Sequence, residues 1–298
     1  MRKLSSSFCL TLLLCLSAQA QTSGAAGAAA AVGGRFKAQV AAISAGTNGE
    51  ARRAAVTKRL DELGVKYRLE EFAAAGDQRR GVNVFAELPV AAGGAAKRRL
   101  MLGAHYDRVA EGQGALDNAS GSAVVLELLA ALKAKPLSHT SVTVAFFDLE
   151  ERGLLGSRAY VAAAQEKKAL PDLFLNFDVF GYGDTLWVMS PTNDTPAAQA
   201  LAQAAEANKF PLRVGTEYPP SDHLSFLPAK VETLSFSLIG GEEIPHILKI
   251  FKREQPAQVP RALTIIHTPN DTPDKLDPAA VARALPVIEG AIRLMDVK

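Results

Sequence analysis

Histidine and carboxylate side chains directly follow an apolar segment of the chain. His105 and Asp107 come after the run RRLMLGA, and Asp117 lies ten residues beyond Asp107 in a glycine-rich connection. Imidazole and carboxylate groups beside buried segments are costly to desolvate unless something pairs with them. These residue types and their spacing therefore raise the question of which partner neutralises them.

Three further apolar segments end in the same way. Glu150 and Glu151 follow SVTVAFFDL, Asp178 follows LFLNF, and His267 follows ALTII. If these runs are strands, their carboxyl ends meet at the edge where open α/β sheets bind ligands. So many carboxylate and imidazole groups would repel one another or stay unpaired without cations, and two divalent metals satisfy them all. Imidazole and carboxylate ligation without thiolate suits zinc, with manganese or cobalt as substitutes.

The chain alternates short apolar runs with helical patterns, as a sheet that holds these side chains requires. The predicted strands are 66–72, 81–90, 98–104, 141–149, 173–179, 185–190, 231–239 and 262–266. The predicted helices are 51–63, 120–134, 156–168, 195–209 and 278–295. The helix at 120–134 is apolar nearly all round, so we expect it to be buried. The alternation predicts an α/β fold whose mainly parallel sheet is covered on both faces.

The amino terminus has the layout of a secretory signal peptide. Arg2 and Lys3 precede a short apolar segment, and a small-residue cleavage pattern ends at Ala20. We therefore expect residues 1–20 to be a signal peptide, residues 21–35 a flexible Gly/Ala-rich spacer, and residues 36–298 one domain. The mature protein is predicted to be exported, periplasmic or secreted. The apolar segment is too short for stable membrane insertion.

Composition narrows the class of protein further. Both cysteines, Cys9 and Cys15, lie in the predicted signal peptide, so the mature chain is expected to hold no disulfide and to rely on its core. Without Arg2 and Lys3, the 33 basic residues become 31, against 31 acidic residues. This balance does not favour nucleic acid or anionic membranes as partners.

The segments GAHYD, LDNASGS, FFDLEERGLLGS, NFDVFG, SDH and HTPNDT together resemble the co-catalytic di-zinc aminopeptidases. That family also contains glutamate carboxypeptidases and glutaminyl cyclases. The resemblance runs from about Asn83 to the carboxyl terminus, and the spacings fit compact bacterial secreted aminopeptidases. It implies a three-layer α/β/α fold with a mixed, mainly parallel central sheet of the zinc exopeptidase type.

The resemblance also implies a metal site with two Zn²⁺ per chain. One zinc would be held by His105, Asp117 and Asp178. The other would be held by Asp117, Glu151 and His267, so that Asp117 bridges the two ions. Asp107 would accept the ring N–H of His105 and fix its tautomer. The peptide bond between Asp117 and Asn118 is often cis in such proteins.

The resemblance implies that Glu150 is the general base, because it is the acidic residue left without a metal. It would take a proton from the water shared by the two zinc ions, and the resulting hydroxide would attack the N-terminal peptide bond. Glu150 would then pass the proton to the leaving amine. The expected substrates are peptides with a free N-terminus.

Two departures from the family pattern leave details open. Compact relatives often have Tyr before the last histidine ligand, where this chain has Ile266, and some have Arg before SDH, where this chain has Pro220 and Ser221. Tyr218 and His223 are the candidates for the missing hydrogen-bond donor and for substrate binding. The alternatives to an aminopeptidase are a glutaminyl cyclase on the same scaffold, a carboxypeptidase, or a non-catalytic binding relative.

Overall fold

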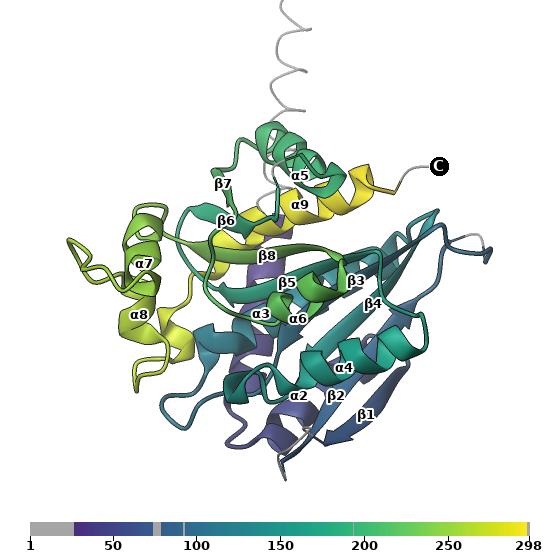
Figure 1. Cartoon of the computed structure of the whole chain (residues 1–298), viewed down its shortest axis with the longest axis horizontal. Helices are drawn as coiled ribbons and strands as arrows, with labels where there is room; N and C mark the ends of the chain where they lie inside the picture. Colours follow the sequence, from purple (N-terminus) through teal and green to yellow (C-terminus); the bar gives the residue numbers. More distant parts are fainter. Residues whose placement is uncertain (1–26, 74–78, 92, 193, 297–298) are drawn as a thin grey trace, which may run out of the picture.

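One eight-stranded sheet runs through the middle of the computed structural model, which describes residues 27–73, 79–91, 93–192 and 194–296 (Figure 1). Four neighbouring strand pairs are parallel (β3 with β4, β3 with β5, β5 with β8, β6 with β7) and three are antiparallel. The predicted mixed, mainly parallel sheet is therefore confirmed. In sheet order the strands are β1 (Tyr67–Ala73), β2 (Arg80–Leu88), β4 (Thr140–Phe147), β3 (Arg98–His105), β5 (Leu173–Phe180), β8 (Glu232–Ile239), β6 (Thr185–Met189) and β7 (Leu212–Gly215).

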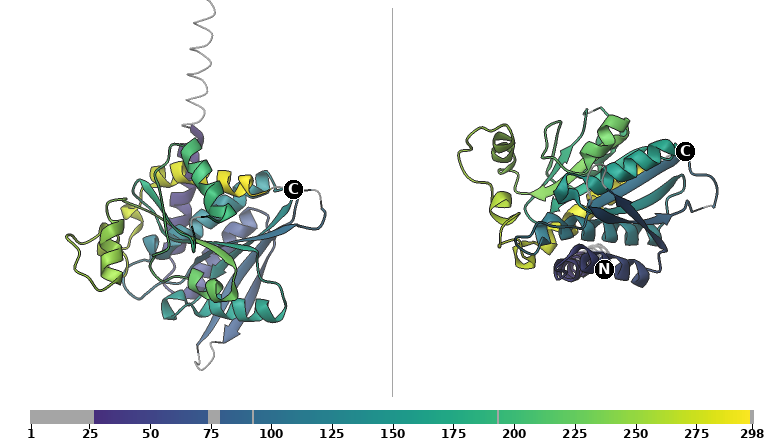
Figure 2. Two further views of the ribbon diagram at one scale, coloured as in Figure 1. Left: turned by 45° about the horizontal axis from the view of Figure 1, so that its top comes forward. Right: turned by 60° about the horizontal axis from the view of Figure 1, so that its bottom comes forward.

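Helices cover both faces of the sheet, which gives the predicted three layers (Figure 2). Alternate side chains of the strands point to opposite faces. On one face, strand residues such as Leu102 pack with helix residues such as Val56 and Ile288. On the other face, Phe147 packs with Val161 and Phe226. The first face carries α2 (Gly49–Glu62), α3 (Ser120–Ala134), α5 (Pro196–Ala207) and α9 (Pro278–Leu294), and the second carries α4 (Leu155–Glu166) and α6 (His223–Phe226).

The helix α3 is buried as its composition predicts. By length and hydropathy alone, the described segment Ala115–Ala134 is apolar enough to cross a membrane, but 89% of its most apolar stretch is buried inside the fold. It lies against β3 and β5 and also contacts α9. Its apolar residues therefore serve as the core beneath the carboxyl ends of the strands.

The carboxyl-terminal part contains an element that the sequence pattern assigned wrongly. Residues 262–266 were expected to form a strand, but Arg261–Ile265 form the short helix α8. Ala262 and Ile265 are three residues apart and both buried, which is helical spacing. A run of five apolar residues is too short for periodicity to separate a strand from a helical turn. His267 therefore follows a helix rather than a strand.

The expected flexible spacer is wrong for residues 27–35, because residues 27–44 are helical. Alanine is the strongest helix former, and Phe36, Val40 and Ile43 give this helix a buried apolar face. Arg35 and Gln39 also bind the buried carboxylate of Glu127 in α3, at 2.8 and 2.6 Å. The predicted signal peptide and residues 21–26 lie outside the described residues.

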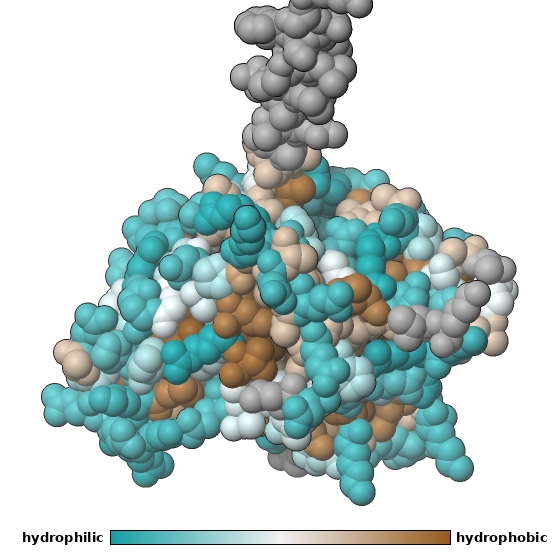
Figure 3. Space-filling model, turned by 90° about the horizontal axis from the view of Figure 1, so that it is seen from above, coloured by the Kyte–Doolittle hydropathy of each residue, from teal (hydrophilic) through white to brown (hydrophobic). Residues whose placement is uncertain are grey.

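The outer surface is largely polar. Figure 3 shows one face of the molecule, on which hydrophilic residues predominate and hydrophobic residues form small patches between them. Among the described residues, the exposed large apolar side chains are Leu69, Leu224, Phe251, Val259 and Leu294. Phe251 closes α7 (Ile244–Phe251), which packs with α8 beside β6.

Candidate metal centre

The structure brings the predicted ligand residues to one edge of the sheet. His105 is the last residue of β3, Glu150 and Glu151 open the short 3-10 helix η2 (Glu150–Arg152) after β4, and Asp178 lies near the end of β5. Because β3 is parallel to both β4 and β5, these ends point the same way. His267 reaches the same place from the segment after α8.

The imidazole and carboxylate groups form three clusters: two that share Asp117, and a third made of His105, Glu150 and Glu151. In the first, Nε2 of His105 lies 3.2 Å from Oδ1 of Asp117 and 3.6 Å from Oδ1 of Asp178. In the second, Nε2 of His267 lies 3.0 Å from Oδ2 of Asp117 and 3.2 Å from Oε2 of Glu151. Within each cluster the potential ligand atoms all lie within 4.8 Å of one another. This spacing allows one cation to contact every member of a cluster.

Asp107 connects the two strand ends that carry the cluster. Its Oδ1 lies 3.3 Å from Nδ1 of His105, on the opposite side of the ring from Asp117. Its two carboxylate oxygens also accept the backbone N–H groups of Glu150 at 3.1 Å and Glu151 at 3.2 Å. One buried side chain therefore orients both the histidine and the acidic pair.

The bridging Asp117 is held in an irregular turn, the π-helix η1 (Ala115–Ala119). The peptide bond between Asp117 and Asn118 is cis. The side chain of Asn118 donates to the Phe177 carbonyl of β5 at 2.8 Å and accepts the N–H of Gly121 at 2.9 Å. A Cβ on Gly121 would lie 2.3 Å from that carbonyl, so only glycine allows this close approach of α3 to β5.

A second acidic side chain supports the same turn from the far end of the chain. The carboxylate of Asp271 accepts the backbone N–H of Leu116 at 2.6 Å and that of Asp117 at 3.2 Å. Asp271 follows His267 by four residues, so the two segments that flank the second cluster are tied together. Burial raises the pKa of Asp271 to about 6.

The carboxylates of the cluster repel one another in a buried setting. Burial raises the pKa of Glu150 to about 10; the charge of His105 opposes this rise, and the carboxylates of Asp222 and Asp178 add to it. Burial also raises the pKa of Glu151. Buried carboxylates are stabilised in their charged form only when positive charge lies beside them. The cluster therefore favours the binding of cations.

The nearby carboxylates stabilise the charged form of the two histidines and so raise the pKa of each ring. Burial lowers the pKa of His105, but the carboxylates of Glu150 and Asp107 outweigh it and hold that pKa well above its usual value. Hydrogen bonds to Asp117 and Glu151 raise the pKa of His267 to about 10. The acidic groups thus demand positive charge at both rings, which a proton or a divalent cation supplies.

Two buried acceptors support the cation interpretation directly. Oδ1 of Asp178 and Oε1 of Glu151 have no hydrogen-bond partner among the described residues. Buried carboxylate oxygens are ordinarily paired. A cation beside each would satisfy them without any change of side chain, so the residues present fit divalent metal ions.

The backbone is strained at one residue of the site, His267, and directly beside two others, before Glu150 and after Asp178. Leu149, Val179 and His267 have φ values of 57°, 53° and 57°. This left-handed region is unfavourable for residues other than glycine, above all for β-branched valine. Such positions persist where the surroundings enforce them, and they gather at functional sites.

The motif SDH contributes a residue that the sequence analysis did not single out. Asp222 is fully buried, and neither of its carboxylate oxygens has a hydrogen-bond partner among the described residues. Burial raises its pKa to about 7, and its charge adds to the potential at Glu150. Its position next to His223 in the SDH motif is the feature of the sequence that could have identified it.

The two predicted substrate-binding residues lie next to each other. His223 opens α6, is 2% exposed, and makes an edge contact with the ring of Tyr218 at 5.6 Å. Burial lowers the pKa of His223 to about 4, so its ring is neutral at pH 7. The hydroxyl of Tyr218 lies 2.5 Å from Oγ of Ser237, which donates to the Asp178 carbonyl at 2.6 Å.

An apolar pocket of about 60 Å³ adjoins the cluster at Asp178. Its walls come from β6, the Tyr218 loop, α7 and α8. Ile266, which stands where the family resemblance led us to expect a tyrosine, lines this pocket directly before His267 of the second cluster. The principal lining residues are Trp187, Tyr218, Ile247, Phe251, Leu263 and Ile266.

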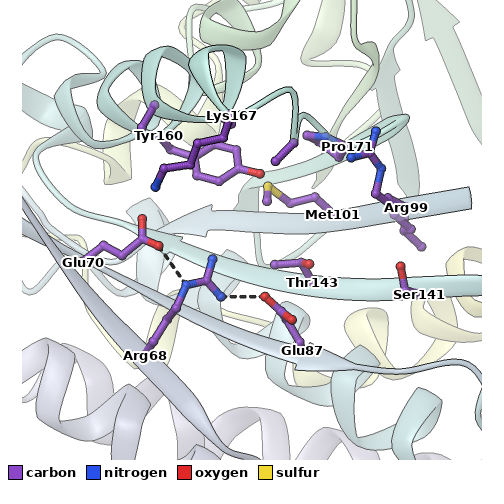
Figure 4. A pocket seen from close by; sticks show the side chains of 14 residues that line it. Arg68, Glu70, Glu87, Arg99, Met101, Ser141, Thr143, Tyr160, Lys167 and Pro171 are labelled. Carbon is purple, nitrogen blue, oxygen red and sulfur yellow. Dashed lines mark hydrogen bonds and ion pairs between the residues drawn. The ribbon is translucent and has the colours of Figure 1, made fainter. Parts of the chain in front are cut away.

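A larger hollow of about 280 Å³ lies beside α4 and contains none of the cluster residues (Figure 4). Three of its charged side chains pair with one another: Arg68 binds Glu70 at 2.8 Å and Glu87 at 2.7 Å. The guanidinium also lies over the ring of Phe85 at 4.7 Å. The clusters at the sheet edge, rather than this hollow, are therefore the candidate catalytic site.

Peptidases are among the known proteins that this chain resembles. Over 84 residues it is 49% identical to an aminopeptidase of Pseudomonas aeruginosa, a stretch that covers 28% of this chain and 15% of that protein. The matched stretches cover 15% to 54% of the curated relatives, so the chain spans at most about half of their length.

Solved structures share the fold. BSAP, a zinc aminopeptidase from Bacillus subtilis, aligns over 72% of this chain and 50% of its own, with a TM-score of 0.59 and 25% identity. A glutaminyl cyclase from an Acidobacteriales bacterium aligns over 89% of this chain and 94% of its own, with a TM-score of 0.71 and 20% identity. The three-layer arrangement is thus a known one.

The sequence model that describes peptidase family M28 matches residues 83–291 of this chain. This range begins within β2, ends within α9, and contains both clusters and Glu150. Because the match extends over more than half of the chain, the protein belongs to peptidase family M28.

Proposed function

We propose that this chain is a metal-dependent aminopeptidase that hydrolyses the N-terminal peptide bond of peptides. The observation that carries the proposal is the pair of clusters that share Asp117, with Glu150 beside them. Membership of the peptidase family supports hydrolysis as the reaction, and the known aminopeptidases among its relatives support the amino end as the point of attack.

The proposed cofactor is two zinc ions per chain. His105, Asp117 and Asp178 would hold one ion, and Asp117, Glu151 and His267 the other. When bound, zinc ions polarise the scissile carbonyl and lower the pKa of an attacking water to near 7. Three protein ligands per ion leave the open position that a catalytic site requires.

Glu150 is the proposed general base. Its carboxylate lies within 4.8 Å of ligand atoms of His105 and Glu151, one residue from each of the two groups that share Asp117, and neither of those groups needs it to supply three ligands. Asp107 holds its backbone N–H at 3.1 Å and so restrains where the side chain starts. Divalent cations nearby would lower its raised pKa and leave the carboxylate free to take a proton from water. The same group then delivers that proton to the leaving amine.

The proposed substrates are peptides with a free, apolar N-terminal residue. The carboxylates around Asp178 provide negative charge for an α-ammonium group. The pocket lined by Trp187, Tyr218 and Ile266 lies next to Asp178 and offers an apolar surface for the first side chain. Its apolar lining favours aliphatic side chains over charged ones, and its small volume limits their size.

We further propose that the protein is exported after removal of residues 1–20. Arg2, Lys3 and the short apolar segment before Ala20 support this. Intact-mass analysis of protein recovered from outside the cytoplasm is expected to show an amino terminus near Gln21. A retained Met1 would contradict it.

Substrate profile and metal content together test the proposed activity. Leu-p-nitroanilide is expected to be cleaved and its N-acetylated form left intact, by protein that holds close to two zinc ions per chain. His105→Ala is expected to lose about one zinc and most of the peptidase activity. Rapid cleavage of blocked internal bonds would contradict exopeptidase action.

A glutaminyl cyclase is the competing proposal, because such an enzyme shares this fold. The family resemblance implies that a cyclase of this kind would need one zinc, held by an Asp, a Glu and a His. One zinc in the wild-type protein, with ammonia release from a peptide that begins with Gln, would favour the cyclase over the aminopeptidase.

A further inference from the structure

A buried arginine outside the matched family region holds the connection between two ligand residues. Arg52 of α2 is fully buried, and its guanidinium donates to three backbone carbonyls. Nε binds the carbonyl of Tyr106, Nη1 that of Gln113 at 2.8 Å, and Nη2 that of Gly114 at 2.9 Å. One rigid planar group thus contacts the chain at both ends of the same connection.

These carbonyls lie next to the proposed ligands. Tyr106 directly follows His105, and Gly114 precedes Asp117 by three residues. The backbone N–H of Gln113 donates to the Asp271 carbonyl at 2.8 Å, so the connection also reaches the segment of His267. A displacement of the Arg52 side chain would therefore move the two ends of the connection relative to each other.

The helix that carries Arg52 is itself well fixed. The side chain of Asn48 accepts the N–H of Ala51 at 2.9 Å and caps α2. Val56 and Leu60 are buried on the same face of α2 as Arg52. The guanidinium is therefore presented from a rigid element rather than from a loop.

The surroundings keep the guanidinium charged. Burial lowers the pKa of Arg52 to about 10, and the charges of Asp107 and Asp271 oppose the fall. An arginine that stays protonated at neutral pH and bonds to carbonyls rather than to one carboxylate acts as a fixed fork of donors.

We infer that Arg52 is a positioning residue that sets the placement of His105 relative to Asp117 and so strengthens zinc binding; this inference rests on the metal site proposed above. If Arg52 acted only through its charge, its removal would change zinc affinity in the opposite direction. A positive charge near the site repels a divalent cation, so loss of the charge alone would tighten zinc binding. Loss of positioning weakens it, as is usual when groups that orient metal ligands are removed.

The test compares Arg52→Met and Arg52→Lys with Arg59→Met. Arg59 lies in the same helix, and its guanidinium pairs with Glu62 on the surface, so the control makes the same chemical change away from the connection. The zinc dissociation constant is measured by competition with a chromogenic chelator, at a temperature where each variant is folded by circular dichroism. The melting temperature is recorded in parallel.

Arg52→Met is expected to weaken zinc binding by about tenfold to a hundredfold, with Arg59→Met within twofold of wild type. Arg52→Lys is also expected to weaken it by at least about tenfold, because one ammonium group cannot bond to three carbonyls with the geometry of a guanidinium. If Arg52→Met fails to fold, Arg52→Lys, which keeps the charge and most of the stem, decides the question.

Two results would overturn the inference. If a variant has unchanged zinc affinity and a lower melting temperature, Arg52 has only a structural role. If Arg52→Met binds zinc more tightly, Arg52 affects the site only through its charge. A wild-type protein that binds no zinc would instead refute the proposed metal site, so the two failures are distinguishable.

Discussion

The carboxylate of Asp107 accepts the backbone N–H of Glu150 at 3.1 Å, and this bond joins the end of β3 to the end of β4. The same carboxylate lies 3.3 Å from the ring of His105. A proposed ligand and the proposed base are therefore held by one residue that has neither role itself.

Asp107→Asn is expected to lower zinc affinity and kcat/KM by about 10- to 100-fold. An amide keeps one acceptor oxygen, so it cannot serve two N–H groups and an imidazole at once, and it removes a charge that favours the ring proton. Zinc competition and steady-state kinetics measure the two effects. Asp184→Asn is the matched control, because Asp184 accepts the N–H of Gly241 and belongs to none of the clusters. Zinc affinity of Asp107→Asn within twofold of wild type would contradict the role.

Glu150→Gln and Glu151→Gln separate the base from the ligand. Glu150→Gln is expected to lower kcat by about 10²-fold or more with zinc content unchanged, because an amide cannot take a proton from water. Glu151→Gln is expected to lose zinc, because the second cluster then keeps only one of its two carboxylates, that of Asp117. Metal analysis and kinetics on the same samples distinguish them. Equal loss of zinc in both variants would contradict the assignment of Glu150 as the base and Glu151 as the ligand.

Leu263→Trp tests the apolar pocket. Leu263 is half-buried at the wall, so a larger side chain is expected to fill part of the 60 Å³ space. The kcat/KM for Leu-p-nitroanilide should fall by about tenfold or more, while that for Ala-p-nitroanilide falls less, because a small side chain needs less of the pocket. Leu224→Trp, on the exposed surface, is the control. An equal fall for both substrates would argue against a side-chain pocket.

His223 predicts a pH dependence of stability. Burial lowers its pKa from about 6.5 to about 4, so the folded chain binds fewer protons than the unfolded chain between these values. This contribution to stability is present above pH 6.5 and is lost as the pH falls toward 4. Between pH 7 and pH 5 the loss is about 2 kcal/mol.

Urea unfolding of metal-free protein at both pH values measures this effect. His223→Gln cannot take up the proton, so its free energy of unfolding should fall less than that of wild type over this range. His139→Gln, in the connection before β4, serves as the comparison. Parallel losses in wild type and His223→Gln would mean that His223 is not the group responsible.

Local patterns in the sequence were sufficient for most of the sheet, including the edge strand β1, but not for the opposite edge, β7. Strands such as β3 and β5 are continuous apolar runs, and their ends could be read from the polar residues that follow. The four-residue edge strand β7 has too few residues for a pattern. The segment 262–266 was misread because α8 is a single buried turn.

Some residues of the site could be predicted from the sequence and others could not. His105, Asp117 and the others stand out because their chemistry interrupts apolar runs. Arg52 does not, since it is one of two adjacent arginines in an amphipathic helix. Its spacing to Val56 and Leu60 places it on the apolar face, and this was the available signal. Its partners lie more than fifty residues away, so only the folded chain shows what it binds.

The sharing of Asp117 between two clusters has a consequence for biosynthesis. A chain made from its amino terminus contains His105, Asp117 and Asp178 well before His267 emerges. The second cluster also needs α8, which follows β8, the strand that joins β5 to β6. Such long-range assembly is slow compared with local folding. If the protein binds two metal ions as proposed, uptake of the second would therefore report that the last third of the chain has been synthesised and joined to the sheet.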